Sequence, residues 1–180
     1  MVKKNNARGE KVKVEKSKEA IVKTLEFTFS TALIAVPLYL IFNSTTFLND
    51  LAARGTQIAL QMLGKSSTLA MANGFPLLKL GGFSGAGGLD VEIINLCAGG
   101  IELALLAGFV LASRDKPLSY RVKGIAAGFA FFFIFNSARI AFTINSFGTA
   151  WFEPLHEVLF RAILIIGLVT FYAVWYLWRE

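Results

Sequence analysis

Long apolar segments dominate this sequence and restrict what it can fold into. Residues 27–49 carry no charge, and Glu102 is the only charged residue within 93–113. A helix of about 20 predominantly apolar residues crosses the hydrocarbon core of a bilayer. We therefore predict an all-α integral membrane protein, built as a compact bundle of four transmembrane helices. The predicted spans are about 27–47, 93–113, 123–143 and 156–178.

Positive charge is concentrated in two segments and predicts the orientation of the helices. Eight basic residues precede the first apolar segment: Lys3, Lys4, Arg8, Lys11, Lys13, Lys16, Lys18 and Lys23. Segment 114–123 holds four more. Because basic loops stay cytoplasmic, both termini are expected inside the cell, with segments 43–92 and 143–155 outside. We predict a basic cytoplasmic segment at 1–23 and one transmembrane domain at 24–180.

The net charge of +6 does not indicate nucleic-acid binding. The basic residues gather beside an apolar segment and lack the interleaved aromatic residues of a nucleic-acid site. A basic cluster in that place is typical of an anchor that faces anionic lipid headgroups. The lipid bilayer is therefore an expected partner, and nucleic acid is not.

The first outer segment has a pattern of its own. Apolar residues recur at helical spacing at Leu48, Leu51, Ala52, Gly55, Ile58, Ala59, Met62 and Leu63. Polar residues fill the other face, at Asn49, Asp50, Arg54, Gln57 and Gln61. This pattern predicts an amphipathic helix that lies on the membrane surface or caps the bundle. The glycine-rich stretch 81–88 that follows predicts a turn-rich loop or a small hairpin.

The single cysteine, Cys97, lies about one turn into the second predicted span. Free N–H groups and the positive end of the helix dipole favour a thiolate there. The small residues Ala98, Gly99 and Gly100 leave room for a peptide backbone to approach. One cysteine cannot form an intrachain disulfide, and a thiolate zinc site needs more ligands. The alternative is a buried thiol that packs as a small hydrophobe.

Arg139 ends a short polar motif inside the third span. Asn136 precedes it by one helical turn, so both side chains share a face. The guanidinium could hold a carboxylate or stabilise an oxyanion, with Asn136 fixing its orientation. Alternatively, Arg139 reaches the headgroups or pairs with Glu102. Glu102 is expected to pair with Arg139 or Arg161, or to be protonated, and Arg161 is a second candidate for the site.

His156 stands at the start of the fourth span, after a short aromatic stretch and Pro154. A neutral imidazole there could take a proton from a thiol or deliver one to a leaving amine. The alternative is a solvent-facing loop histidine. In the predicted topology, Cys97, Arg139 and His156 share the outer rim of the bundle. Such a set offers a nucleophile, a charge stabiliser and a base on the outer face of the cell membrane.

Three short motifs carry a resemblance to a known family. They are Cys97-Ala98-Gly99 preceded by Val91-Glu92-Ile93, then Asn136-Ser137-Ala138-Arg139, then Leu155-His156-Glu157. In order, spacing and placement, residues 89–165 resemble the archaeosortase/exosortase family of membrane transpeptidases. Two departures stand out, since many relatives have more spans and the Cys97 tract carries one glycine more than the common form. Some archaeal relatives use arginine rather than histidine at the third position, so Arg161 remains a candidate for that role.

The resemblance implies a cysteine-type transpeptidase or peptidase. Its substrates would be exported proteins whose C-terminal signal joins a short motif, a hydrophobic helix and a basic tail. Cys97 would cleave the signal through a thioester and transfer the protein to a lipid or surface acceptor, assisted by Arg139 and His156. No cofactor or metal is expected. The alternative is a non-catalytic membrane subunit of a transporter or envelope assembly, for which Cys97→Ala would be silent.

Overall fold

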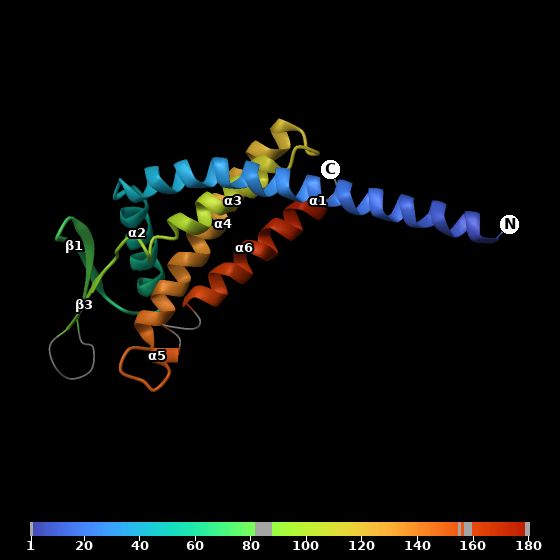
Figure 1. Ribbon diagram of the computed structural model, residues 1–180. Helices are drawn as coiled ribbons and strands as arrows, with labels where there is room; N and C mark the ends of the chain where they lie inside the picture. Colours follow the sequence, from blue (N-terminus) through green and yellow to red (C-terminus); the bar gives the residue numbers. More distant parts are fainter. Residues whose placement is uncertain (1, 82–87, 155, 157–159, 179–180) are drawn as a thin grey trace.

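The computed structural model describes residues 2–81, 88–154, 156 and 160–178, which are mostly helical (Figure 1). The helices are α1 (Val2–Asn43), α2 (Phe47–Met62), α3 (Gly100–Ala112), α4 (Leu118–Asn145), α5 (Phe152–Pro154) and α6 (Phe160–Leu177). Strands β1 (Ser67–Ala72), β2 (Phe75–Leu80) and β3 (Leu89–Glu92) form one antiparallel sheet in the order β1-β2-β3. The predominance of helix is confirmed, but the prediction of an all-α fold is wrong because of this sheet.

Two stretches of the described helices are long and apolar enough to cross a bilayer. They are Glu15–Asn43 within α1 and Leu118–Asn145, which is the whole of α4. Only 11% and 39% of their most apolar stretches are buried. A core helix of a soluble protein would instead bury most of such a stretch. These two helices therefore favour association with a membrane.

The other two predicted spans correspond to shorter helices. Helix α3 has 13 residues. It is about 20 Å long at 1.5 Å per residue, which is less than the roughly 30 Å core of a bilayer. The span predicted for 93–113 therefore begins too early. The apolar part of α6, Ala162–Leu177, is also short of a full span, and the four-helix transmembrane bundle stays a prediction.

Asparagine side chains hold residues 93–95 in a non-helical path. Asn49 Nδ2 donates a hydrogen bond to Ile93 O at 2.9 Å, and Asn95 Nδ2 donates to Asn43 Oδ1 at 2.9 Å. Asn49 is only 1% exposed, so this bond replaces the water that the amide would otherwise bind. The two contacts tie the chain before α3 to the region where α1 ends and α2 begins.

Helix α2 is the amphipathic helix predicted for residues 48–63, but its buried face differs from the prediction. Asn49 was assigned to the polar face and is buried, whereas Ile58 and Met62 were assigned to the apolar face and are 57% and 84% exposed. A Cβ added at Gly55 would meet the Ser137 side chain of α4. Close packing against α4 therefore decides which side of α2 is covered.

The sheet begins with a tight hairpin. Asn73 and Gly74 have φ values of 53° and 84°, as in the two-residue turn that Asn-Gly favours. The pairing runs from Ser67↔Leu80 to Ala72↔Phe75. This hairpin precedes the glycine-rich stretch and was not predicted; the loop or hairpin predicted for 81–88 falls mostly on residues 82–87, which lie outside the described residues. The inward side of the sheet packs with α2 and α4 in one apolar cluster.

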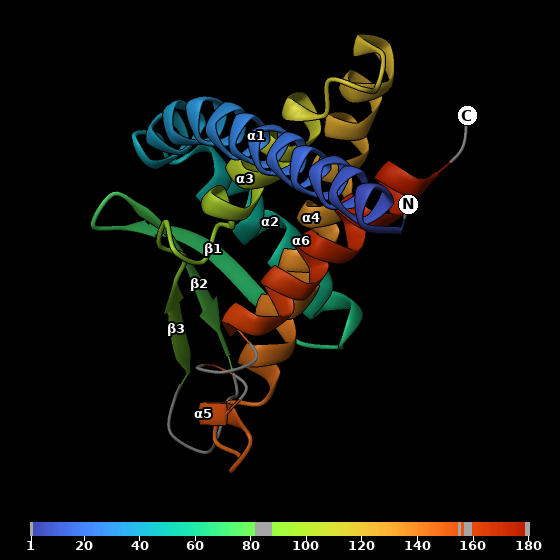
Figure 2. The same cartoon turned by 45° about the vertical axis from the view of Figure 1, so that its right-hand side comes forward.

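Figures 1 and 2 show how these elements position the site. The sheet and α5 lie at one end of the molecule, and the connection from α3 to α4 and the end of α6 lie at the other. Glycines allow the helices to approach closely, since a Cβ at Gly108 would lie 2.9 Å from Thr31 O of α1. Helices α1 and α3 therefore pack closely at this position.

Candidate active site

Cys97 lies in the tight turn that joins β3 to α3. Its N–H donates to Ile94 O at 2.8 Å, and the N–H of Ala98 donates to Asn95 O at 3.3 Å. Gly99 precedes α3 with a φ of 76°, a conformation that glycine adopts without strain. Cys97 therefore stands before the helix, and the prediction that it lies one turn inside it is wrong.

Two side chains of α4 bind the backbone of this turn. Asn136 Nδ2 donates to Cys97 O at 2.8 Å, and Arg139 Nη2 donates to the same oxygen at 3.4 Å. Asn136 is 4% exposed and Arg139 is 8% exposed. Their spacing of one helical turn puts both on one face, as expected. The structure thus brings three of the candidate residues together around one carbonyl oxygen.

Glu102, in the first turn of α3, lies beside the same turn. A Cβ added at Gly99 would lie 3.5 Å from Asn136 Nδ2 and 3.9 Å from Glu102 Oε2. The guanidinium of Arg139 interacts electrostatically with both Cys97 and Glu102. The charge of Arg139 therefore acts on Glu102, and the expected pairing of the two side chains stays a prediction. The side chain of Arg161, the other expected partner, lies outside the described part of the structure.

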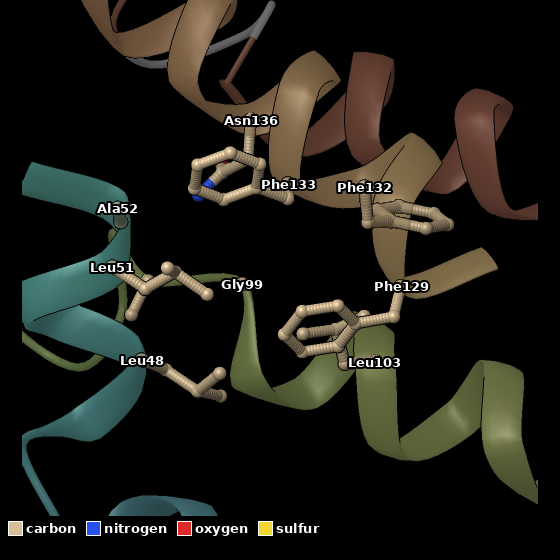
Figure 3. A pocket seen from close by; sticks show the side chains of 10 residues that line it. Leu48, Leu51, Ala52, Gly99, Leu103, Phe129, Phe132, Phe133 and Asn136 are labelled. Carbon is tan, nitrogen blue, oxygen red and sulfur yellow. The ribbon is translucent and has the colours of Figure 1, made fainter. Parts of the chain in front are cut away.

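A small pocket of about 20 Å³ lies next to the turn, between α2, α3 and α4 (Figure 3). Its walls are mostly apolar, with Leu48 and Leu51 from α2 and Phe132 and Phe133 from α4. Asn136 closes one end, and its Oδ1 is buried without a hydrogen-bond partner among the described residues. A volume of this size holds about one water molecule. The pocket can hold a water on Asn136, but it cannot admit a peptide.

A larger cavity of about 300 Å³ opens beside Cys97. Strand β3 and the C-terminal part of α4 line it, and His156 is part of its wall. The His156 ring stacks on Phe152 with 5.5 Å between centroids, and Phe152 in turn meets the edge of Phe147 at 5.1 Å. His156 is exposed, as its loop alternative predicts, yet it borders the same cavity as the thiol. Leu155 and Glu157 of the same motif lie outside the described residues.

The surroundings of Cys97 have two opposite effects on the pKa of its thiol. Burial raises the pKa of the Cys97 thiol, and this is the largest effect. The positive charge of Arg139 and a backbone hydrogen bond from Ile94 lower the pKa and offset part of the rise. The expectation of a thiol activated in the free protein is therefore not supported. Desolvation of the thiolate outweighs the nearby charge, so deprotonation calls for a base.

Alkylation of Cys97 tests this balance. We expect iodoacetamide to react more slowly at pH 7 than with free cysteine, and the rate to continue rising above the ordinary thiol pKa of about 8.5, where the rate for free cysteine levels off. Arg139→Ala should slow the reaction further, because the charge that favours the thiolate is lost. Arg121→Ala is the matched control, since Arg121 also donates from α4 to a backbone carbonyl, that of Leu111 at 2.8 Å. A native thiol that reacts at pH 7 as fast as free cysteine would contradict the account.

Comparison with known proteins gives one distant similarity. The chain is similar to a probable archaeosortase D of Methanocaldococcus jannaschii, with 28% identity over 78 residues. The match covers 43% of this chain and 51% of the archaeal protein, so the chain spans about half the length of the curated relative it matches. No protein-family profile matches the chain, and no solved structure matches it. The similarity is partial, and it points toward the archaeosortases.

Sequence reasoning did not find the walls of the larger cavity. Phe152 stacks on the His156 ring and packs in turn against Phe147, and β3 forms the wall next to Cys97. The Asn73-Gly74 dipeptide was the available signal for a hairpin, and hence for a sheet beside the cysteine. In the part of the chain that the structure describes, no three His, Cys, Asp or Glu side chains gather to hold a metal ion.

Proposed function

We propose that this protein is a membrane cysteine transpeptidase. It cleaves the C-terminal sorting signal of exported proteins and transfers them to a membrane or surface acceptor. The observation that carries the proposal is that Cys97 and His156, from distant parts of the chain, border one cavity of about 300 Å³. The distant similarity to a probable archaeosortase D supports the same class of activity.

The proposed reaction uses Cys97 as the nucleophile. His156 takes the thiol proton while the sulfur attacks the peptide carbonyl carbon, and a tetrahedral oxyanion forms. The C–N bond then breaks, and His156 returns the proton to the departing amine, which leaves a thioester on Cys97. An acceptor amine or hydroxyl, or water, attacks the thioester and gives its proton to His156. That proton restores the thiol, so the enzyme ends as it began.

Arg139 is proposed to stabilise negative charge in the reaction and to position the turn that bears Cys97. Its guanidinium has five N–H donors, and one of its nitrogens donates to Cys97 O at 3.4 Å. That contact fixes the turn on which the nucleophile stands, together with the bond from Asn136. The positive charge also favours the thiolate and the oxyanion. Glu102 supports this arrangement through its electrostatic interaction with Arg139.

A second candidate function is a non-catalytic subunit of a membrane assembly. The observation that favours it is that Cys97 is half-buried and packs against the apolar cluster of α2, α4 and the sheet. A thiol with a pKa raised by burial is also what a purely structural cysteine shows. The two functions differ in one result, which is whether Cys97→Ala leaves the protein active.

The proposal includes a topology with four spans, cytoplasmic termini and the site on the outer face of the cell membrane. The basic residues before residue 24 and within 114–123 support this orientation. They lie toward the end of the molecule opposite the sheet and α5 (Figure 1). Cys97 and His156 lie near the sheet end, where exported proteins would reach them.

Labelling of single cysteines tests this topology. The sequence has one cysteine, so Cys97→Ala provides a cysteine-free background. In this background, Ser119→Cys and Thr68→Cys each introduce a single thiol at an exposed position. We expect an impermeant maleimide to label Thr68→Cys in intact cells and Ser119→Cys only after permeabilisation. The reverse pattern would contradict the topology.

Processing of a candidate target tests the function itself. A suitable target is an exported protein encoded beside this chain that ends in a short motif, a hydrophobic helix and a basic tail. Co-expression with the native chain should shorten the target, and Cys97→Ala should leave it full length. Leu96→Ala is the matched control, since Leu96 stands in the same turn with a 62% exposed side chain. Processing by Cys97→Ala would support the non-catalytic alternative.

A further inference from the structure

Strand β3 has one edge that no other strand of the described residues covers. The sheet order is β1-β2-β3, and β3 pairs with β2 alone. The N–H of Ile93 donates to the carbonyl of its direct partner Pro76 at 2.9 Å. In an antiparallel ladder, hydrogen-bonded pairs alternate with non-bonded pairs. The backbone groups of Leu89, Val91 and Ile93 therefore face β2, and those of Asp90 and Glu92 face the free edge.

The larger cavity follows this strand to Cys97. Five consecutive residues, 89–93, border the cavity together with Cys97. Alternate side chains of a strand point to opposite faces. A cavity that touches every residue of the strand therefore reaches its backbone, and not only the side chains of one face. The end of α4 and the turn after it also line the cavity, with Ile140 and Phe147 among their residues. The space is thus a slot bordered by a strand edge and by apolar side chains.

We infer that the substrate adds to this edge as a fourth strand, and that this pairing delivers its scissile bond to Cys97. The inference rests on the proposed function and specifies how the substrate is recognised. Its occupant is the short motif of the sorting signal, because a hydrophobic helix has no free backbone groups to pair with a strand. The N–H and C=O groups of Asp90 and Glu92 bind the extended motif backbone, as in other cases of strand addition.

The pairing also predicts which side chains the motif carries. A strand on this edge would point alternate side chains toward the apolar walls formed by Ile140 and Phe147. The side chains between them would lie on the face of Asp90 and Glu92, where two carboxylates disfavour an acidic residue. A motif that alternates an apolar residue with a neutral or basic one fits the slot.

Proline on the edge tests the inference. Glu92→Pro removes an N–H that faces the free edge and leaves the β2–β3 bonds in place, which edge strands tolerate. We expect it to raise the KM for the candidate target by about tenfold, since one backbone hydrogen bond is lost and the substrate carbonyl stays unbonded. Glu92→Ala loses the same carboxylate but keeps the N–H, so the KM of Glu92→Pro should exceed that of Glu92→Ala by this factor, and the comparison isolates the backbone hydrogen bond.

Two further measurements keep the result interpretable. The thermal unfolding midpoint of Glu92→Pro in detergent should match that of Glu92→Ala; if it does not, Asp90→Pro takes its place. Hydrogen exchange in Cys97→Ala should then show the amides of Asp90 and Glu92 becoming protected on addition of a synthetic peptide covering the motif and hydrophobic helix of the target. An unchanged KM in the folded proline variant, or exchange at both amides unaffected by the peptide, would overturn strand addition. Those results leave the proposed function standing if Cys97→Ala is inactive, whereas processing by Cys97→Ala would defeat both.

Discussion

Cys97→Ser is expected to reduce target processing by about 10³-fold or more, as the loss of a nucleophile does in other enzymes. Serine is nearly the same size as cysteine, so the turn at residues 95–99 should keep its hydrogen bonds. An alcohol is far less acidic than a thiol, however, and burial already raises the pKa of the Cys97 thiol. A base that suffices for the thiol would therefore not suffice for serine.

The measurement is a gel shift of the target in cells that co-express each variant. Leu96→Ala should process the target like the native chain, because its exposed side chain stands outside the cavity. Cys97→Ala should be as inactive as Cys97→Ser. Substantial processing by Cys97→Ala, which has no nucleophilic atom at this position, would show that the cysteine is not the nucleophile.

Arg139→Lys is expected to lower processing by about 10²-fold, the effect of losing one well-placed donor to a developing oxyanion. Lysine keeps the positive charge but lacks the planar fork of the guanidinium. Its ammonium is a point charge on a flexible stem, so it does not present donors to Cys97 O and to a substrate in one fixed geometry. The loss should fall on kcat, because the missing interaction belongs to the transition state rather than to substrate binding.

Arg121→Lys is the matched control for this substitution. Arg121 also lies on α4 and donates to a backbone carbonyl, but it does so at Leu111, near the opposite end of α3. We expect it to retain processing close to that of the native chain. Equal activity of Arg139→Lys and the native chain would remove Arg139 from the proposed chemistry.

The helices around the site could be predicted from the sequence, because hydropathy and helical spacing are local properties. Helix α2 forms where the pattern at 48–63 predicts it, and α4 contains the third predicted span. The meeting of Cys97 with Asn136 and Arg139 followed from that helix order. Each of these predictions depended only on apolar length and on residues one helical turn apart.

The turn that bears Cys97 could not be predicted in the same way. Residues 93–99 are as apolar as the helix that follows, so hydropathy does not separate them from α3. What separates them is a tertiary contact, since the buried amide of Asn49 binds Ile93 O. The thiol pKa is likewise set by burial in the folded chain, which the helix-dipole argument for Cys97 did not include.

His156→Ala refines the proposed roles. Because burial disfavours the thiolate, we expect this variant to process the target about 10²-fold more slowly, the usual effect of losing a general base. Raising the pH should restore part of the rate, since the thiol then ionises without a base. Arg161→Ala is the comparison, and an inactive Arg161→Ala beside an active His156→Ala would transfer the role to Arg161.

Capture of the acyl-enzyme with hydroxylamine tests the central claim most directly. Hydroxylamine attacks a thioester on Cys97 and releases the processed target with a C-terminal hydroxamate, which mass spectrometry identifies. The account predicts that the native chain forms this hydroxamate at the cleavage site and that Cys97→Ala forms none. Cleavage of the same bond by Cys97→Ala at the native rate would contradict it.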